Sequence, residues 1–124
     1  MATVELTAES FAPALEDNDI VLVDFWAEWC GPCRAFGPIY ERVSQEHPDI
    51  VFGKVDTEAE QDLAAQFGIM SIPTLAIIRD RVVLFLQPGV VPEDGLENLI
   101  SQVRALDMDE VRRSVAEQQE ATAS

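Results

Sequence analysis

Two residues separate the only cysteines of this chain, Cys30 and Cys33, and this pair lies between two predicted elements. The nearly continuous apolar run from Ile20 to Trp26 predicts a strand that is covered on both faces. The segment 34–46, which follows the pair, has apolar residues at helical spacing and predicts a helix. Two thiols at such a junction can close into a small disulfide ring and open again. Because a helix N-terminus favours negative charge, we expect the first thiol to be partly ionised, which supports disulfide exchange.

Composition excludes several classes of protein. A chain of 124 residues with 48% hydrophobic content predicts one domain with one core, and two cysteines are too few for a disulfide-stapled scaffold. The net charge of −15 would repel nucleic-acid phosphates and anionic membranes. The N-terminus resembles no secretory signal, and no apolar run approaches the roughly 20 residues of a membrane helix. We therefore expect a monomer of the reducing cytoplasm, where a Cys-x-x-Cys pair is more often catalytic than structural.

Strand and helix patterns alternate along the chain, which predicts an α/β fold with a central sheet. A tight connection at Asp80 and Arg81 predicts that the last two strands form an antiparallel hairpin. Strands are predicted at 3–6, 20–26, 50–56, 74–78 and 82–87, and helices at 8–15, 34–46, 58–67 and from about 92.

The two thiols are expected to do different work. Exchange needs one thiol that is exposed and partly ionised, and Cys30, just before the helix, is expected to face outward. Cys33 is expected inside the first turn and more buried, within reach of a mixed disulfide on Cys30, which it would attack to release the reduced product. Gly31 permits close backbone approach, and Pro32 restricts the ring.

Two other readings of the cysteine pair are weaker. A closed zinc site normally takes four ligands, and His47, the single histidine, lies at the far end of the same predicted helix. An inert structural disulfide across so short a loop would add little stability. We therefore expect no bound metal.

Asp24 interrupts the most apolar strand, so burial is expected to raise its pKa towards neutrality. Such a carboxyl could take the proton from Cys33, although a purely structural hydrogen-bonded carboxyl is the alternative. Lys54, the sole lysine, is expected on the neighbouring strand, either pointing towards Asp24 or solvated. Trp26 is expected to pack in the core and Trp29 to lie exposed on a docking surface.

Residues 23–33 resemble the active-site signature of the thioredoxin family. The resemblance extends to Pro38, Lys54, Asp56, residues 72–74 and Gly89, and it spans residues 3–106. It implies the thioredoxin fold, a central mixed β-sheet flanked by helices in a single domain over residues 1–106. It also implies a cis bond before Pro73, where base rates alone favour trans. Residues 107–124 are predicted to be a C-terminal extension, partly helical or disordered.

The resemblance implies a protein-disulfide reductase that binds no cofactor and acts in electron transport and cell redox homeostasis. Its disulfide would be reduced by a flavin-containing thioredoxin reductase that draws on NADPH, and it would reduce the disulfides of client proteins. By position, Cys30 maps to the nucleophile, Cys33 to the resolving thiol, Asp24 to the proton acceptor and Lys54 to its neighbour. The groove that receives an extended client maps to Trp29, Gly31, Pro32, Ile72, Pro73 and Gly89.

Three features depart from the family pattern. Arg81 stands where glycine is common in the hairpin turn, Pro88 and Val90 alter the rim of the groove, and the chain continues beyond Leu106. Two further functions stay open at this point: a disulfide oxidase or isomerase of an oxidising compartment, and a non-catalytic binding subunit that uses the same apolar surface.

Overall fold

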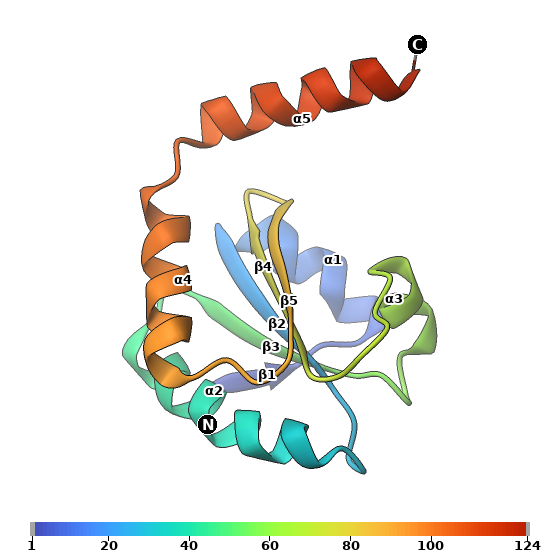
Figure 1. Cartoon of the computed structure of the whole chain (residues 1–124), viewed down its shortest axis with the longest axis vertical. Coiled ribbons are helices and arrows are strands. Elements are labelled where there is room, and N and C mark those ends of the chain that lie inside the picture. The colour runs from blue at the N-terminus through green and yellow to red at the C-terminus, as the bar shows by residue number, and fades with distance from the viewer. Residues whose placement is uncertain (1, 124) are drawn as a thin grey trace.

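The computed structural model describes residues 2–123, with side chains up to residue 121, and folds them into a five-stranded sheet flanked by helices (Figure 1). The strands are β1 (Thr3–Glu5), β2 (Ile20–Trp26), β3 (Val51–Asp56), β4 (Thr74–Arg79) and β5 (Val82–Pro88). The helices are α1 (Ala8–Asp17), α2 (Gly31–Glu46), α3 (Gln61–Gln66), α4 (Glu93–Ala105) and α5 (Met108–Ala123).

Strand β2 lies in the middle of the sheet, whose strand order is β1-β3-β2-β4-β5. It pairs in parallel with β3, where Asp24 is opposite Lys54, and antiparallel with β4, where Phe25 is opposite Thr74. The sheet is therefore mixed, and the predicted thioredoxin fold is confirmed. β1 and β5 form its two edges.

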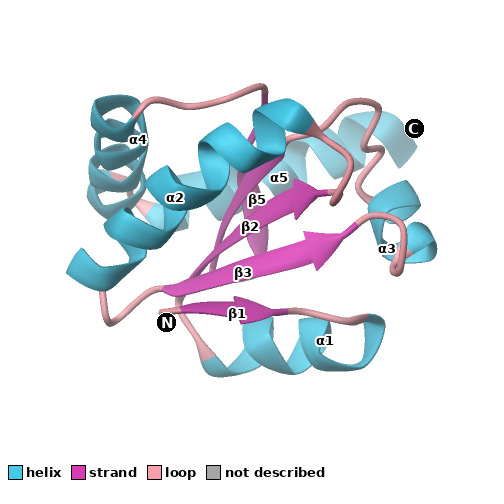
Figure 2. Cartoon of the chain, turned by 90° about the horizontal axis from the view of Figure 1, so that it is seen from below, coloured by secondary structure: helices cyan, strands magenta, loops and turns pink. Residues whose placement is uncertain are grey.

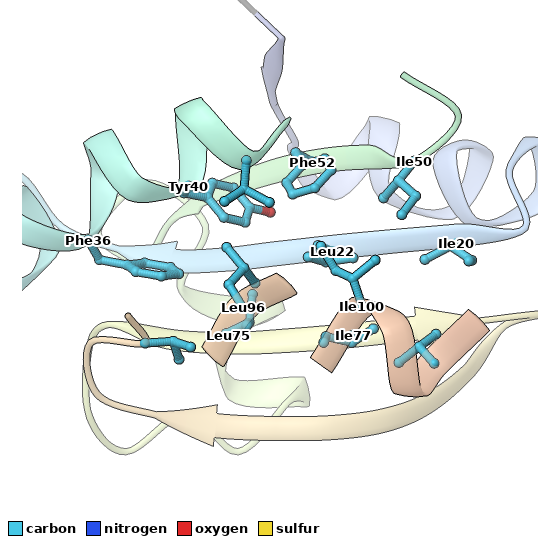
Figure 3. Packing of buried hydrophobic residues seen from close by; sticks show 13 residues of the cluster. Ile20, Leu22, Phe36, Tyr40, Ile50, Phe52, Leu75, Ile77, Leu96 and Ile100 are labelled. Atoms are coloured by element: carbon cyan, nitrogen blue, oxygen red, sulfur yellow. The ribbon is translucent and has the colours of Figure 1, made fainter. Parts of the chain in front are cut away.

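Alternate side chains of β2 pack into two separate hydrophobic cores. Leu22 packs in a cluster with residues of α2 and α4, including Tyr40 and Leu96 (Figure 3). Val23 packs on the opposite face with residues of α1 and α3, including Phe11 and Leu63. Figure 2 shows this arrangement, with α2 and α4 on one side of the sheet and α1 on the other. Burial on both faces explains why the strand reads as a continuous apolar run.

The largest differences between the observed helices and the sequence prediction are at the starts of α2 and α3. α2 begins at Gly31 rather than at residue 34, because proline needs no amide partner in a first turn and Cys30 serves as the N-cap. α3 is shorter than the predicted 58–67, because the Asp56 carboxylate accepts the amides of Glu58 and Ala59 and holds these residues in a turn. Both differences come from local hydrogen bonding that periodicity does not report.

The predicted hairpin between β4 and β5 is confirmed. Its two turn residues, Asp80 and Arg81, have φ values of 50° and 65°, in the left-handed region that favours glycine. Asp80 also donates its amide to the carbonyl of Asp19 at 2.9 Å. The arginine at this position therefore takes up a backbone conformation that costs a side-chain-bearing residue more than it would cost glycine.

Helix α5 follows α4 after a short break and runs past the tip of the hairpin, where Figure 1 draws it in red. Asp107 caps its start, since its carboxylate accepts the amides of Asp109 and Glu110. Met108 is buried. Within residues 2–123, no helix has the length and apolar character needed to cross a membrane.

The packing of β3 against Leu6 gives a stability prediction. A Cβ added at Gly53 would press on the Leu6 side chain, 2.8 Å from Leu6 Cγ, and would come within 3.3 Å of the Leu22 carbonyl oxygen. We expect Gly53→Ala to lower the free energy of unfolding by about 1–3 kcal/mol, measured by urea denaturation.

Gly37 provides the matched control, because a Cβ added at this position in α2 meets nothing within 4 Å. Alanine is the better helix former, so Gly37→Ala should raise the free energy of unfolding by up to about 1 kcal/mol. Equal effects of the two substitutions would contradict the packing described here.

Candidate active site

The two cysteines form a disulfide at the N-terminus of α2, with their Cα atoms 5.3 Å apart. Cys30 is the N-cap of the helix, and its Sγ accepts the backbone amide of Cys33 at 3.2 Å. After reduction, the same amide and the helix N-terminus would stabilise a thiolate on Cys30. The local structure thus prepares Cys30, rather than Cys33, to carry negative charge.

The prediction that Cys30 is more exposed than Cys33 is wrong. Cys30 is only 3% exposed and Cys33 5%, so the first cysteine is not the more accessible one in the disulfide form. Ala27 is buried with them, and the side chains of Trp26 and Ile72 pack against this cluster. Cys30 Sγ lies 3.7 Å from the carbonyl oxygen of Ile72. Tertiary contacts from the loop before β4 therefore cover a residue that the local sequence places at the surface.

The two cysteines differ instead in the hollow that each one lines. Cys30 lines a groove of about 580 Å³ on the side of α3, together with Trp29, Gly31, Pro32 and Ile72. Cys33 lines a smaller hollow of about 310 Å³ with Trp26, Lys54 and the first turns of α2. A molecule in the larger groove would meet Cys30, whereas Cys33 would be reached from the other hollow.

The groove also contains residues that sequence reasoning missed. These further lining residues are Thr57, Gln61, Ala64, Ile69, Met70 and Ser71. Met70 is 97% exposed, an unusual environment for a large apolar side chain. Its place just before Ile72 and Pro73 is the one sequence signal that could have singled it out.

Trp29 also lines the groove and is 65% exposed. Its indole Nε1 donates a hydrogen bond to the Glu58 carboxylate at 2.6 Å, which fixes the orientation of the ring. The ring therefore presents apolar surface to solvent in a defined position.

The peptide bond between Ile72 and Pro73 is cis. Gly89 has a φ of 92° and donates its amide to the carbonyl oxygen of Pro73 at 2.8 Å. The backbone after β5 is therefore held against the proline loop, close to the disulfide.

Asp24 is completely buried in β2, and neither carboxylate oxygen has a hydrogen-bond partner among the described residues. Burial raises the pKa of this carboxyl to about 7, and the positive charge of Lys54 opposes part of that increase. A group with this pKa exchanges protons at neutral pH. The alternative of a hydrogen-bonded structural carboxylate finds no partner within residues 2–123.

Lys54 lies opposite Asp24 in the strand register but does not form a close ion pair with it, since no such pair is found within 4.0 Å among the described residues. Its Nζ lies 4.9 Å from the centroid of the Trp26 ring instead, in cation–π geometry. The Trp26 Nε1 atom in the same part of the structure is buried and has no hydrogen-bond partner among the described residues.

Residues 2–123 contain no group of three or more side chains placed to hold a metal ion. His47 caps the far end of α2, where its Nε2 contacts the Glu97 carboxylate at 3.0 Å.

Comparison with known proteins points to one family. The Thioredoxin family model matches residues 2–102. The chain is 61% identical over 118 residues to a putative thioredoxin 2 of Streptomyces coelicolor, a match covering 95% of this chain and 88% of that protein. This match therefore reaches into residues 107–124. Thioredoxin of Bacillus subtilis is 38% identical over 103 residues, 82% of this chain and 98% of that one.

Solved structures agree with the sequence matches. A mutant thioredoxin from Halobacterium salinarum superposes with a TM-score of 0.79 at 30% identity, covering 86% of this chain and 95% of that one. Thioredoxin of Plasmodium falciparum gives a TM-score of 0.74 at 30% identity, covering 81% and 97%.

The raised pKa of Asp24 predicts how stability depends on pH. The folded protein holds this proton up to pH about 7, whereas the unfolded chain releases it near the ordinary pKa of 3.8. Stability is therefore lost as pH rises from about 4 to about 7, by about 4 kcal/mol in total, and is constant above that range. We expect Asp24→Asn to remove this loss, so that the oxidised variant is the more stable protein at pH 8.

Urea denaturation of both proteins between pH 4 and pH 8 measures this difference. The gap between them should widen with increasing pH and close near pH 4. A variant that is less stable than the wild type at pH 8 would mean that the carboxylate is paired and structural.

Proposed function

We propose separate roles for the two cysteines of this chain, which belongs to the thioredoxin family and is a thiol–disulfide oxidoreductase that reduces protein disulfides by exchange through Cys30 and Cys33. Cys30 is the attacking nucleophile and Cys33 the resolving thiol. This division is supported by the different hollows beside the two cysteines. Cys30 lines the groove of about 580 Å³, whereas Cys33 lines the smaller hollow of about 310 Å³.

In the first step, the Cys30 thiolate attacks one sulfur of a client disulfide. The client S–S bond breaks, a mixed disulfide forms, and the other client sulfur leaves as a thiolate that takes a proton from water. The Cys33 amide, which now donates to Cys30 Sγ, lowers the cost of holding the attacking charge.

In the second step, the Cys33 sulfur attacks Cys30 and releases the second client thiol. Cys33 must lose its proton for this attack, and Asp24 accepts it. The raised pKa of Asp24 supports this role, because the carboxyl can take up and return a proton near neutrality. Lys54, opposite Asp24, tunes that pKa downward.

Clients bind in extended form along the surface made by Trp29, Gly31, Pro32, Ile72, Pro73 and Gly89. The apolar, exposed Trp29 offers side-chain contact, and an extended client would pair with the backbone next to Pro73 in the manner of strand addition. We include Met70 in this surface because it is almost fully exposed and lines the groove with Trp29 and Ile72, whereas Pro73 and Gly89 are not among the groove's lining residues.

The disulfide formed in each cycle is reduced again by a flavin-containing thioredoxin reductase that draws electrons from NADPH. We place this electron-transport cycle in the cytoplasm, with residues 1–106 as the catalytic domain and residues 107–124 as a separate extension. One structural neighbour, at 28% identity, was solved in a study of thiol resolution in a yeast mitochondrial peroxiredoxin. Peroxiredoxins are therefore one class of client to test.

The two cysteines should give opposite results when changed one at a time. Cys30→Ser should abolish NADPH-coupled insulin reduction in the presence of a thioredoxin reductase, because no mixed disulfide can form. Cys33→Ser should form stable mixed disulfides with clients, seen as adducts on non-reducing gels and released by dithiothreitol. Adducts on Cys33 in the Cys30→Ser variant, with none in Cys33→Ser, would reverse the roles assigned here.

Asp24→Asn should slow the resolving step more than the first attack. General-base removal typically costs about 10²-fold or more. We therefore expect at least a tenfold fall in the resolution rate at pH 7, followed by stopped-flow tryptophan fluorescence. Asp94→Asn, the same substitution at an exposed position in α4, serves as the control. An unchanged resolution rate would exclude Asp24 as the proton acceptor.

A further inference from the structure

A further hollow, of about 550 Å³, separates α5 from the hairpin end of β5. We call it the α5 groove. Its lining comprises the apolar residues Val82, Val83, Leu84, Leu106, Val111 and Val115, and the polar residues Asp107, Glu110, Arg113, Ser114, Glu117 and Gln118. Most of these residues lie beyond the end of the family match at residue 102, so the groove is not part of the site described above.

The strand wall of the α5 groove is an edge of the sheet. β5 pairs with β4 on one side only, and Val83 in its first half is 49% exposed. An open edge strand presents unpaired backbone donors and acceptors to any extended chain that reaches it. This wall can therefore bind a further strand through main-chain hydrogen bonds.

The helix wall is anchored at its near end. Met108 is 6% exposed, and Arg112 bridges the Asp80 carboxylate in the hairpin turn at 3.1 Å and the Asp109 carboxylate at 2.6 Å. Val111 and Val115 are only half-buried along the groove. The helix is thus held beside the strand without filling the space between them.

The charge around the α5 groove selects among possible occupants. Its lining carries the three acids Asp107, Glu110 and Glu117 against the single base Arg113, on a chain whose net charge is −15. A second copy of this chain would bring the same negative charge and be repelled, whereas a segment with lysine or arginine would be attracted.

The α5 groove and the disulfide lie at opposite ends of β5. The groove is lined by β5 residues up to Leu84, whereas Pro88 pairs with Thr74 next to the cis proline, so about 13 Å of strand separates them. An occupant of the groove would therefore leave the client site open.

We propose that the α5 groove binds an extended, positively charged segment of a partner protein, which adds as a strand to the free edge of β5. Apolar side chains of the segment pack against Val83, Val111 and Val115, and its lysine or arginine residues face the acidic rim. This docking goes beyond disulfide exchange and does not require the cysteines.

The probe for the test is a labelled synthetic peptide, Lys-Thr-Val-Thr-Val-Thr-Lys, with a matched peptide in which glutamate replaces both lysines. Fluorescence anisotropy with the full chain should show saturable binding of the basic peptide that weakens with added salt, and at least tenfold weaker binding of the acidic one. Val83→Lys should weaken binding of the basic peptide at least tenfold.

Val4 gives the matched control, because it is 46% exposed on β1, the opposite edge strand. Val4→Lys should bind the basic peptide like the wild type, and both lysine variants should keep wild-type insulin reduction. The double variant Cys30→Ser, Cys33→Ser should also bind the peptide normally, so a failure of the redox assignments would not affect this result.

Any one of the following outcomes would overturn the proposal. The first is that the basic peptide shows no saturable binding. The second is that the basic and acidic peptides bind equally well, or that Val83→Lys and Val4→Lys act alike. The third is that analytical ultracentrifugation shows a concentration-dependent dimer of the wild type that the Val83→Lys variant does not form. A second copy of the chain would then be the occupant of the α5 groove.

Discussion

The burial of β2 between two paired strands is the constraint on which the rest of the structure depends. Each of its residues from Ile20 to Phe25 is buried, and its side chains alternate between the two cores that hold the helices against the sheet. The chain leaves this strand directly into the turn that carries Trp29 and Cys30, so the packing that stabilises the fold also sets the position of the disulfide. A strand so fully enclosed has little freedom to shift its register.

The same enclosure gives Asp24 its unusual chemistry. Its carboxyl group lies in a buried strand with no hydrogen-bond partner within residues 2–123, so it holds its proton up to neutral pH, and ionising it above that range destabilises the folded protein. The proposed proton transfer from Cys33 gives this destabilisation a functional reason. Lys54 limits the effect from the neighbouring strand, while its ammonium group packs over Trp26. The site thus combines a helix N-terminus that favours thiolate on Cys30 with a carboxyl group that can exchange a proton near neutrality.

Much of this architecture could be predicted from the sequence, because continuous apolar runs report strands and a short polar connection reports the hairpin. The extent of β2 and the pairing of β4 with β5 follow from such local patterns. The start of α2 could not be predicted in this way, since it depends on Cys30 acting as the N-cap. Nor could the burial of Cys30 or the exposure of Met70, because both depend on how the loop before β4 folds back onto α2. Long-range packing, rather than local preference, decided each of these differences.

The central claim is that the fold gives the two thiols different chemistry. Alkylation of the reduced protein with iodoacetamide between pH 5 and pH 9, followed residue by residue by peptide mass spectrometry, tests it most directly. We expect Cys30 to be modified first, with a reaction midpoint below the ordinary thiol pKa of about 8.5, and Cys33 to react more slowly throughout. Equal rates for the two cysteines, or faster modification of Cys33, would contradict it.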